Sequence, residues 1–413
     1  MKETLKNFII DNWTRTVRTN QDDVGGLIGL PFPYTVPCIS GTFQEMYYWD
    51  TYFTNIGLIL SGEVKQAVNN VENVAYLIEK YGKMPNGNST GFLNRSQPPF
   101  FSQMVREIFE KTADTAWLER IYPTVEKEYC FWQKNRKTSS GLNRYYCDDE
   151  GFFNRETAGW LCERCGVEMP ADENEIIEYA KCFSAFAESG WDCTSRFGLR
   201  AHMFNPVCLN SLLYGMEVNL SYFADILNNG NSDLWMENAE KRKALMNELM
   251  CDDLGVFFDY DFDKKEISGL FSAASFFPLT FGLATKEQAE KTVSYLSKIE
   301  TEYGIAGCEN KAANMLLQWD YPNGWACLHY MVIKGLINYG YNKDAERIAQ
   351  KYAMLVENNF EKTGNLWEKY NVVTGEVSTA TEYETPTMMG WSAGVYLYVK
   401  KLLEMMTDST MAT

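Results

Sequence analysis

Apolar residues recur at three- and four-residue spacing along most of the 413-residue chain, and this period predicts an almost entirely helical protein. Two clear helix starts lie at Thr112–Thr115 and at Asn342. Strand signals are short, with one arm at residues 255–262 and a hairpin at 364–375. The expected helices, about a dozen, cover residues 3–17, 48–61, 64–80, 99–111, 114–135, 174–187, 205–229, 232–249, 285–298, 308–317, 324–339, 343–358 and 390–404.

Helices that follow one another in pairs can build either an open α-solenoid or a closed ring. A solenoid predicts sequence self-similarity at a period of about 34–47 residues, and the chain shows none. We therefore expect an all-α fold of the (α/α)6 toroid type, with short β-hairpins in its loops. No Pro-, Gly- or Ser-rich stretch divides the sequence, so a single domain over residues 1–413, which we expect, is favoured equally with a division into two domains.

The charge of the chain argues against several classes of partner. Its 55 acidic and 38 basic residues give a net charge of −17, whereas proteins that bind nucleic acid or anionic membranes need a basic face. No apolar run reaches the roughly 20 residues of a membrane span. We expect a monomer that binds a small neutral molecule, with neither nucleic acid nor a membrane as partner.

The cysteine and histidine counts argue against a metal site and against a disulfide framework. Eleven cysteines show one close pair, Cys162 and Cys165, and two histidines are present. A zinc site would need two more ligands beside that pair. We therefore expect no structural metal site. Free thiols, together with the lack of a recognisable signal peptide, predict a cytoplasmic location.

Four tryptophans are each followed directly by a carboxylic acid, at Trp49-Asp50, Trp191-Asp192, Trp319-Asp320 and Trp367-Glu368. Blades of a WD-repeat propeller would place such pairs about 40–45 residues apart, but the first three are separated by 142 and 128 residues. A sugar site needs both an aromatic face and carboxyl groups. The pattern therefore indicates a carbohydrate site, with half-buried surface residues as the alternative.

Two of these acids lie where burial would raise their pKa, as a proton donor requires. Asp192 comes just after Gly190, a predicted helix C-cap, and Glu368 lies in the predicted hairpin. The polar loop at residues 81–101 adds hydroxyl, amide and guanidinium groups that can bind sugar hydroxyls. A turn that satisfies its own polar groups is the alternative for this loop.

Longer motifs resemble those of the trehalases, glycoside hydrolase family 37. Residues 41–52 (GTFQEMYYWDTY) and 318–325 (QWDYPNGW) are similar to the two signatures of that family. The PNGN–RSQPPFF loop, the ESGWD–SRF segment, the LWEKY hairpin and the EY–GW segment are also similar, and all occur in the family's order. The resemblance spans about residues 30–400. It implies an (α/α)6 toroid that hydrolyses an α-glucosidic bond with inversion, without metal or cofactor.

The resemblance also implies roles for individual residues. It makes Asp192 the general acid and Glu368 the general base that activates water, and we expect their carboxyl groups ~6.5–9.5 Å apart. Trp319 is implied as an aromatic wall, and Arg155-Glu156 resembles the family's Arg-Pro-Glu element without its proline. The implied sugar ligands are Trp49, Asp50, Asn86, Arg95, Ser96, Gln97, Arg155, Glu156, Gly190 and Glu382.

Two departures from the family affect the expected substrate. Thr42, which has no charge and a shorter reach, replaces a sugar-binding arginine. Residues 375–381 replace a polyglycine lid and are stiffer at their β-branched positions. Trehalose is the expected substrate, and another α-linked disaccharide or a glucosyl- or mannosyl-glycerate is the alternative. An inactive sugar-binding relic and a helical-repeat scaffold are the other classes considered, and retention of both Asp192 and Glu368 argues against the relic.

Overall fold

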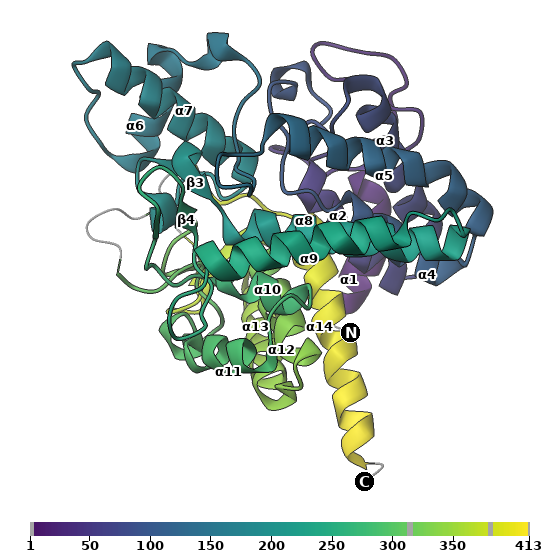
Figure 1. Cartoon of the computed structure of the whole chain (residues 1–413). Helices are drawn as coiled ribbons and strands as arrows, with labels where there is room; N and C mark the ends of the chain where they lie inside the picture. The colour runs from purple at the N-terminus through teal and green to yellow at the C-terminus, as the bar shows by residue number, and fades with distance from the viewer. Residues whose placement is uncertain (1–3, 312–316, 379–382, 412–413) are drawn as a thin grey trace.

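Within the described part of the chain, six helices form a closed ring at the centre of the molecule (Figure 1). The computed structural model describes residues 4–311, 317–378 and 383–411. Each inner helix contacts the next, and α14 returns to α2. This closure confirms a toroid and excludes an open solenoid. The inner helices are α2 (Tyr48–Leu60), α4 (Phe101–Thr112), α8 (Val207–Leu227), α10 (Phe277–Thr280), α12 (Ala326–Asn338) and α14 (Gly390–Met411).

Inner and outer helices differ in how many of their sides are apolar. Every residue from Tyr48 to Leu58 in α2 is buried, because this helix is enclosed on all sides. In α9 the buried residues Trp235, Ala239, Arg242 and Met246 form a single stripe, as expected for a helix with one face in water. The outer helices are α1 (Leu5–Asn12), α3 (Val64–Tyr81), α5 (Thr115–Asn135), α9 (Ser232–Leu249), α11 (Lys286–Ser294) and α13 (Asn342–Thr363).

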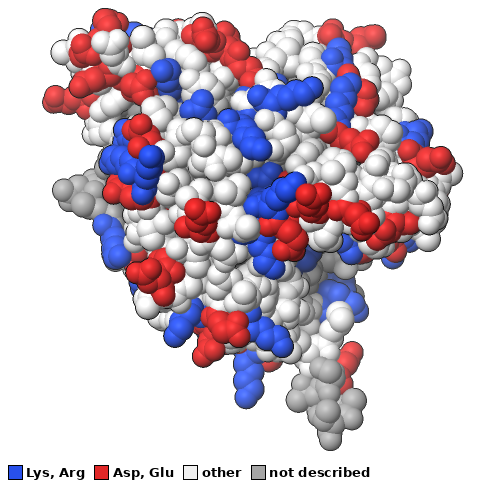
Figure 2. Space-filling model, in the orientation of Figure 1, with Lys and Arg blue, Asp and Glu red and all other residues white. Residues whose placement is uncertain are grey.

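A helical hairpin of α6 (Arg155–Cys165) and α7 (Glu173–Ser189) stands apart from the ring, at the upper left of Figure 1. The sequence analysis missed α6, which buries only Thr157, Ala158, Leu161 and Cys165. Its principal contact is with α7. Acidic side chains gather over the outer surface of this hairpin in Figure 2. A helix with so small an apolar stripe gives a weak periodic signal.

The strands form small antiparallel sheets between the helices. The hairpin expected at residues 364–375 is confirmed as β7 and β8, which turn at Gly375 with a φ of +75°. The arm expected at 255–262 supplies β4. The sheets of the described residues are β1 (Val17–Arg18) with β2 (Tyr34–Thr35), β3 (Phe204–Asn205) with β4 (Tyr260–Asp261) and β5 (Glu266–Ile267), and β6 (Asn323–Trp325) with β7 (Lys369–Asn371) and β8 (Glu376–Val377).

The helix expected at residues 308–317 is wrong where the structure describes it. Residues 308–311 are not helical, and Cys308 forms an isolated β-bridge with Ser272. Residues 312–316 lie outside the described residues. Apolar residues in this segment therefore gave a helical period by spacing alone, while the backbone pairs with another loop.

Candidate active site

A cavity of about 200 Å³ lies at the end of the ring where the inner helices begin. Asp50 is in the first turn of α2, Trp325 directly precedes α12, and Trp391 opens α14. Helix starts thus bring together segments that are hundreds of residues apart in sequence. The described lining residues are Phe43, Tyr47, Trp49, Asp50, Asn86, Phe92, Arg95, Gln97, Arg164, Phe183, Ala187, Gly190, Asp192, Trp319, Trp325, Glu368, Tyr383, Met388 and Trp391.

Most of the residues singled out from the sequence line this cavity. Of the expected sugar ligands, Ser96, Arg155 and Glu156 do not, and Glu382 lies outside the described residues. Trp319, expected as an aromatic wall, lines the cavity. The expected residues that the structure brings together there are Trp49, Asp50, Asn86, Arg95, Gln97, Gly190, Asp192 and Glu368.

The expected position of the Arg155-Glu156 element is corrected by the structure. Both residues are exposed at the start of α6, and Arg155 Nη2 lies 2.7 Å from Glu173 Oε1 on the neighbouring helix. This first turn faces solvent, so neither side chain reaches the cavity. The opposite end of α6 supplies a cation instead, because Arg164 lines the cavity. Sequence spacing did not reveal Arg164.

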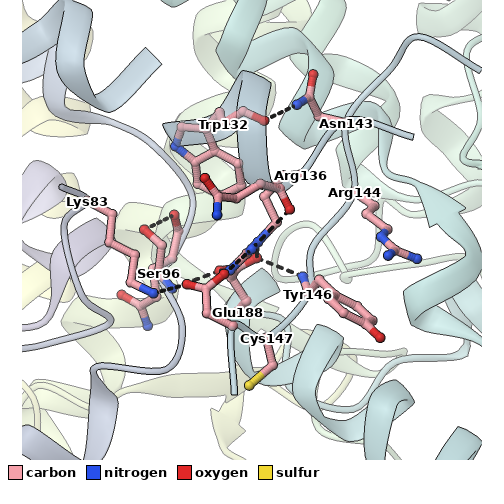
Figure 3. A network of polar contacts seen from close by, with 12 residues as sticks. Lys83, Ser96, Trp132, Arg136, Asn143, Arg144, Tyr146, Cys147 and Glu188 are labelled. Carbon is pink, nitrogen blue, oxygen red and sulfur yellow. Dashed lines mark hydrogen bonds and ion pairs between the residues drawn. The ribbon is translucent and has the colours of Figure 1, made fainter. Parts of the chain in front are cut away.

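Glu188, in the last turn of α7, joins two loops beneath the site (Figure 3). Its Oε1 accepts the backbone N–H of Ser96 at 2.8 Å, and its Oε2 accepts that of Tyr146 at 2.7 Å. Arg136 donates to both oxygens, from Nη2 at 2.8 Å and from Nε at 2.7 Å. The fully buried carboxylate therefore fixes the last turn of α7, which precedes Asp192, against the loop of residues 81–101 and the segment at Tyr146.

Ser96 belongs to this framework rather than to the cavity lining. Its hydroxyl donates to the backbone oxygen of Met84 at 2.6 Å, while its own N–H is bound by Glu188. The expectation that Ser96 binds sugar is therefore corrected. Its two neighbours, Arg95 and Gln97, both line the cavity. Anchoring of the backbone between them keeps these two side chains in place.

Gly190 is required where α7 ends. Its φ is +70°, in the left-handed region that L side chains rarely adopt. A Cβ at this position would lie 2.8 Å from Cε2 of the Trp49 indole. Glycine thus allows the chain to turn sharply while passing directly against the aromatic ring. That turn brings Asp192 to the cavity.

Glu368 is bound by two donors in the cavity. Lys369 Nζ forms an ion pair with its Oε2, and the Tyr383 hydroxyl donates to its Oε1 at 2.7 Å. Burial raises the pKa of Glu368 and the charge of Asp192 adds to this, whereas Lys369 and Tyr383 oppose it. The lysine itself is fully buried. This ion pair favours an ionised carboxylate in the middle of the cavity.

Asp192 has a different environment from Glu368. Burial raises the pKa of Asp192, and the cations Arg164, Arg95 and Lys369 oppose the shift. Arg164 Nη1 lies 3.8 Å from its Oδ2, a longer contact than the ion pair of Glu368. The Asp192 side chain is still 31% exposed. It is therefore open to the cavity and placed to keep its proton more readily than an ordinary aspartate.

Asp50 is the third carboxyl group in the cavity. Burial, followed by the nearby charges of Glu368 and Asp192, raises the pKa of Asp50 to about 8. Three acids in one small space disfavour each other's ionised forms. Because Lys369 pairs with Glu368, Asp50 is left as a group that can donate a hydrogen bond at neutral pH.

Tryptophans form an aromatic floor under these acids. Trp319 and Trp325 stack with ring centroids 3.7 Å apart, and Trp49 lies 5.5 Å from Trp319. Trp391 meets both stacked rings nearly at right angles and donates from Nε1 to the backbone oxygen of Glu368 at 3.0 Å. Packed rings with one polar edge give a rigid surface for a sugar and fix the Glu368 backbone.

Two residues of the sequence analysis take places away from the cavity. Thr42, which stands where the family has arginine, is exposed, and its neighbour Phe43 lines the cavity instead. Asp320, the third Trp-Asp acid, is fully buried and accepts hydrogen bonds from Thr194 and Ser195. The arginine of the family therefore has no counterpart at this point of the cavity wall.

The cavity combines acids, amides, the guanidinium groups of Arg95 and Arg164, and aromatic rings, which suits an uncharged polyol. Among the described residues no group of three or more His, Cys, Asp or Glu could hold a metal ion. No described helix is long and apolar enough to cross a membrane.

The chain matches the family model described as Trehalase over residues 2–406. The chain belongs to the trehalase family. A periplasmic trehalase of Xanthomonas campestris pv. campestris (strain B100) is 34% identical over 426 residues, which cover 96% of this chain and 73% of that protein. The periplasmic trehalase of Pseudomonas aeruginosa (strain PAO1) is 33% identical over 425 residues, 96% of this chain and 76% of that protein.

Solved structures agree with this family assignment. Neutral trehalase from Saccharomyces cerevisiae superposes with a TM-score of 0.78 and 27% identity, over 97% of this chain and 80% of that chain. A mannosylglycerate hydrolase from Thermus thermophilus gives 0.67 and 16%, over 96% of this chain and 100% of that chain, which shows a shared fold. The resemblance noted in the sequence, and the expected (α/α)6 toroid, are confirmed. The protein is a glycoside hydrolase of the trehalase family.

The expected cytoplasmic location is wrong by the same comparisons. The curated relatives from Xanthomonas and Pseudomonas are named periplasmic trehalases. None of the cysteines in the described part of the chain forms a disulfide, and most are buried. Cysteines buried in a folded core are inert wherever the protein resides, so their number could not identify the compartment.

Proposed function

We propose that this protein hydrolyses α,α-trehalose to two glucose molecules with inversion, using Asp192 as general acid and Glu368 as general base. Membership of the trehalase family and the names of its relatives support the reaction. One observation supports the two roles: both carboxyl groups line one small cavity, but their partners differ. The closed ring from α2 to α14 also supports a single catalytic domain over the chain.

The division of roles follows from the charges around each acid. A general base must be ionised, and Glu368 has an ion pair with Lys369 and a hydrogen bond from Tyr383. A general acid must keep its proton, and burial raises the pKa of Asp192 while its cation Arg164 stays 3.8 Å away. The reverse assignment would ask the paired carboxylate to donate a proton.

The reaction then needs two proton transfers. Asp192 protonates the glycosidic oxygen as the bond to C1 breaks, and the departing glucose carries that proton. Glu368 removes a proton from a water that attacks C1 on the opposite face. This geometry requires carboxyl groups ~6.5–9.5 Å apart, which stays our prediction for the pair. Exchange with solvent returns Asp192 to its acid form and Glu368 to its carboxylate.

The other polar groups of the cavity are placed to bind the sugar that is attacked. Asp50, Asn86 and Gln97 offer hydrogen bonds to hydroxyls, and Arg95 offers charged donors. The tryptophan floor covers an apolar ring face. Glycosides of glycerate remain the alternative from the sequence, and no observation on the described residues favours them.

The proposal is tested by following the anomers released from trehalose by proton NMR. Inversion gives equal amounts of α- and β-glucose at first, because one unit is attacked and the other leaves unchanged. Release of α-glucose alone would contradict inversion. Wild type without activity on trehalose, but with activity on another α-glycoside tested in the same way, would contradict trehalose as the substrate.

The same assay tests the residue roles. Asp192→Asn and Glu368→Gln are each expected to lower kcat by about 10²–10⁴-fold. Glu156→Gln is the matched control, because this exposed carboxyl group lies outside the cavity, on the helix that carries Arg164. It is expected to leave kcat unchanged. A full loss in the control, or none in the two variants, would refute the assignment.

A further inference from the structure

The proposed general acid identifies the side of the cavity from which the leaving group departs. A general acid touches the glycosidic oxygen, so the leaving group lies next to Asp192. Arg164 of α6 lies 3.8 Å from that carboxylate and also lines the cavity. The leaving-group side therefore faces α6, an element outside the inner ring.

The size of the cavity requires part of a disaccharide to lie at its rim. The enclosed space is about 200 Å³, below the roughly 300–1,000 Å³ of clefts that bind drug-sized ligands. Asp50 and Glu368 are buried, whereas the Asp192 side chain is 31% exposed, so the enclosed part of the cavity fits one attacked ring. The second ring then lies towards the mouth, beside Arg164.

An aromatic side chain continues this rim along α6. Trp160 precedes Arg164 by four residues, so both lie on the same face of the helix. The Trp160 ring is 5.6 Å from that of Phe183, and the Arg164 guanidinium is 5.2 Å from the same ring. Phe183 itself lines the cavity. Trp160 nevertheless remains 38% exposed, so an aromatic surface leads outward from the cavity.

We propose that Trp160 and Arg164 of α6 form the leaving-group subsite, with Trp160 as the platform for the second ring and Arg164 as a donor to its hydroxyls. This inference rests on the proposed function. A flat ring face over indole, with a planar guanidinium beside it, suits an uncharged pyranose. The acidic outer surface of the hairpin in Figure 2 contrasts with this inward-facing cation.

The same surface explains how the site can function without the family's arginine at position 42. Thr42 is exposed and outside the cavity lining, whereas α6 places a guanidinium beside the acid. Contacts to the leaving group then depend on a helix that packs chiefly against α7. We expect this surface to raise kcat/KM for substrates whose leaving group contains a ring, and not for substrates whose leaving group is a single atom.

Comparison of two substrates distinguishes the effect of this subsite from effects on the rest of the cavity. Trehalose has a glucose leaving group, whereas α-glucosyl fluoride loses fluoride, a single atom without a ring to place on Trp160. Trp160→Ala is expected to lower kcat/KM on trehalose by about fivefold to tenfold, mainly through KM. Arg164→Met is expected to lower it by about tenfold to a hundredfold. Trp160→Ala is expected to act on the fluoride within about twofold of wild type.

Two controls complete the experiment. Ile177→Ala removes an apolar side chain of α7 that is 37% exposed and does not line the cavity, and it should change neither substrate. Trp160→Phe should recover most of the activity on trehalose, because a ring face is restored. Equal losses on both substrates, or no loss on trehalose, would overturn the subsite. Wild type without trehalose hydrolysis would instead refute the proposed function.

Discussion

The buried carboxylate of Glu188 provides a test of how the site is stabilised. Its oxygens accept the N–H groups of Ser96 and Tyr146 and two guanidinium bonds from Arg136. Glu188→Gln preserves the shape but converts one oxygen into an NH2 group. Whichever oxygen is replaced, one backbone N–H and one guanidinium N–H then face another donor. The variant thus removes one acceptor oxygen, the two hydrogen bonds that it accepts, and the negative charge together.

The expected cost follows from these contacts. Removing one partner of a buried ion pair costs about 3–5 kcal/mol, and each unsatisfied buried donor costs about 1–3 kcal/mol. Arg136 retains a second carboxylate, because its Nη1 donates to Asp148 Oδ1 at 2.5 Å. This remaining ion pair favours the lower end of the range. We expect a loss of about 3 kcal/mol in the free energy of unfolding.

Urea denaturation followed by tryptophan fluorescence measures this loss as a lower midpoint at an unchanged slope. A cycle with Arg136→Met and the double variant should give a coupling energy of about 2 kcal/mol. Glu110→Gln is the matched control: its carboxylate pairs with Arg106 on the same helix and is 52% exposed. It should cost less than about 0.5 kcal/mol. If the two single Glu→Gln variants cost the same, the network of Figure 3 does not stabilise the loops.

Three further predictions concern the cavity. Burial and the charge of Glu368 raise the pKa of Asp50 from 3.8 to about 8, so the folded state binds this proton more tightly than the unfolded state. The free energy of unfolding therefore falls as the pH rises from about 4 to about 8. Asp50→Asn should therefore raise the melting temperature more at pH 8 than at pH 5, and equal shifts would contradict this. Lys369→Met removes a cation that lowers the pKa of Glu368, so the acid limb of the kcat/KM profile should move to higher pH; an unmoved limb would exclude this role. Gly190→Ala should cost about 1–3 kcal/mol in thermal denaturation through its φ of +70° and its contact with Trp49, and an unchanged melting temperature would show that the loop adapts.

Five of the six inner helices could be predicted, because enclosure on all sides gives them mostly apolar sequences, whereas the four-residue α10 was not predicted. In α8 and α12 most positions are apolar or small, as enclosure by neighbours requires. The boundaries of α2 and α9 were also close to those expected. The short helix α6 escaped prediction, since its four buried residues leave little period to detect. Helices outside the ring need less apolar surface and so give a weaker signal.

Site residues could be predicted where their chemistry is local in sequence. Asp192 and Glu368 each follow a tryptophan, and the structure places both in the cavity. Arg164 could not be predicted, because its place depends on how α6 lies over the mouth of the cavity. Arg155 shows the reverse error: its sequence neighbours resemble a sugar-binding element, but its helix turn faces solvent. The orientation of a peripheral helix depends on tertiary packing, so it cannot be predicted from a local sequence motif.

Asp192 and Asp320 each follow a tryptophan, but the two carboxyl groups differ in burial and in hydrogen-bond partners. Asp320 is fully buried, and it accepts hydrogen bonds from the Thr194 hydroxyl at 2.8 Å and from the N–H and hydroxyl of Ser195. A carboxylate whose oxygens are bound in this way has little capacity left for substrate. Asp192 opens to the cavity two residues before Thr194. Asp320 therefore fixes the backbone that follows Asp192, and the third Trp-Asp pair positions the acid supplied by the second.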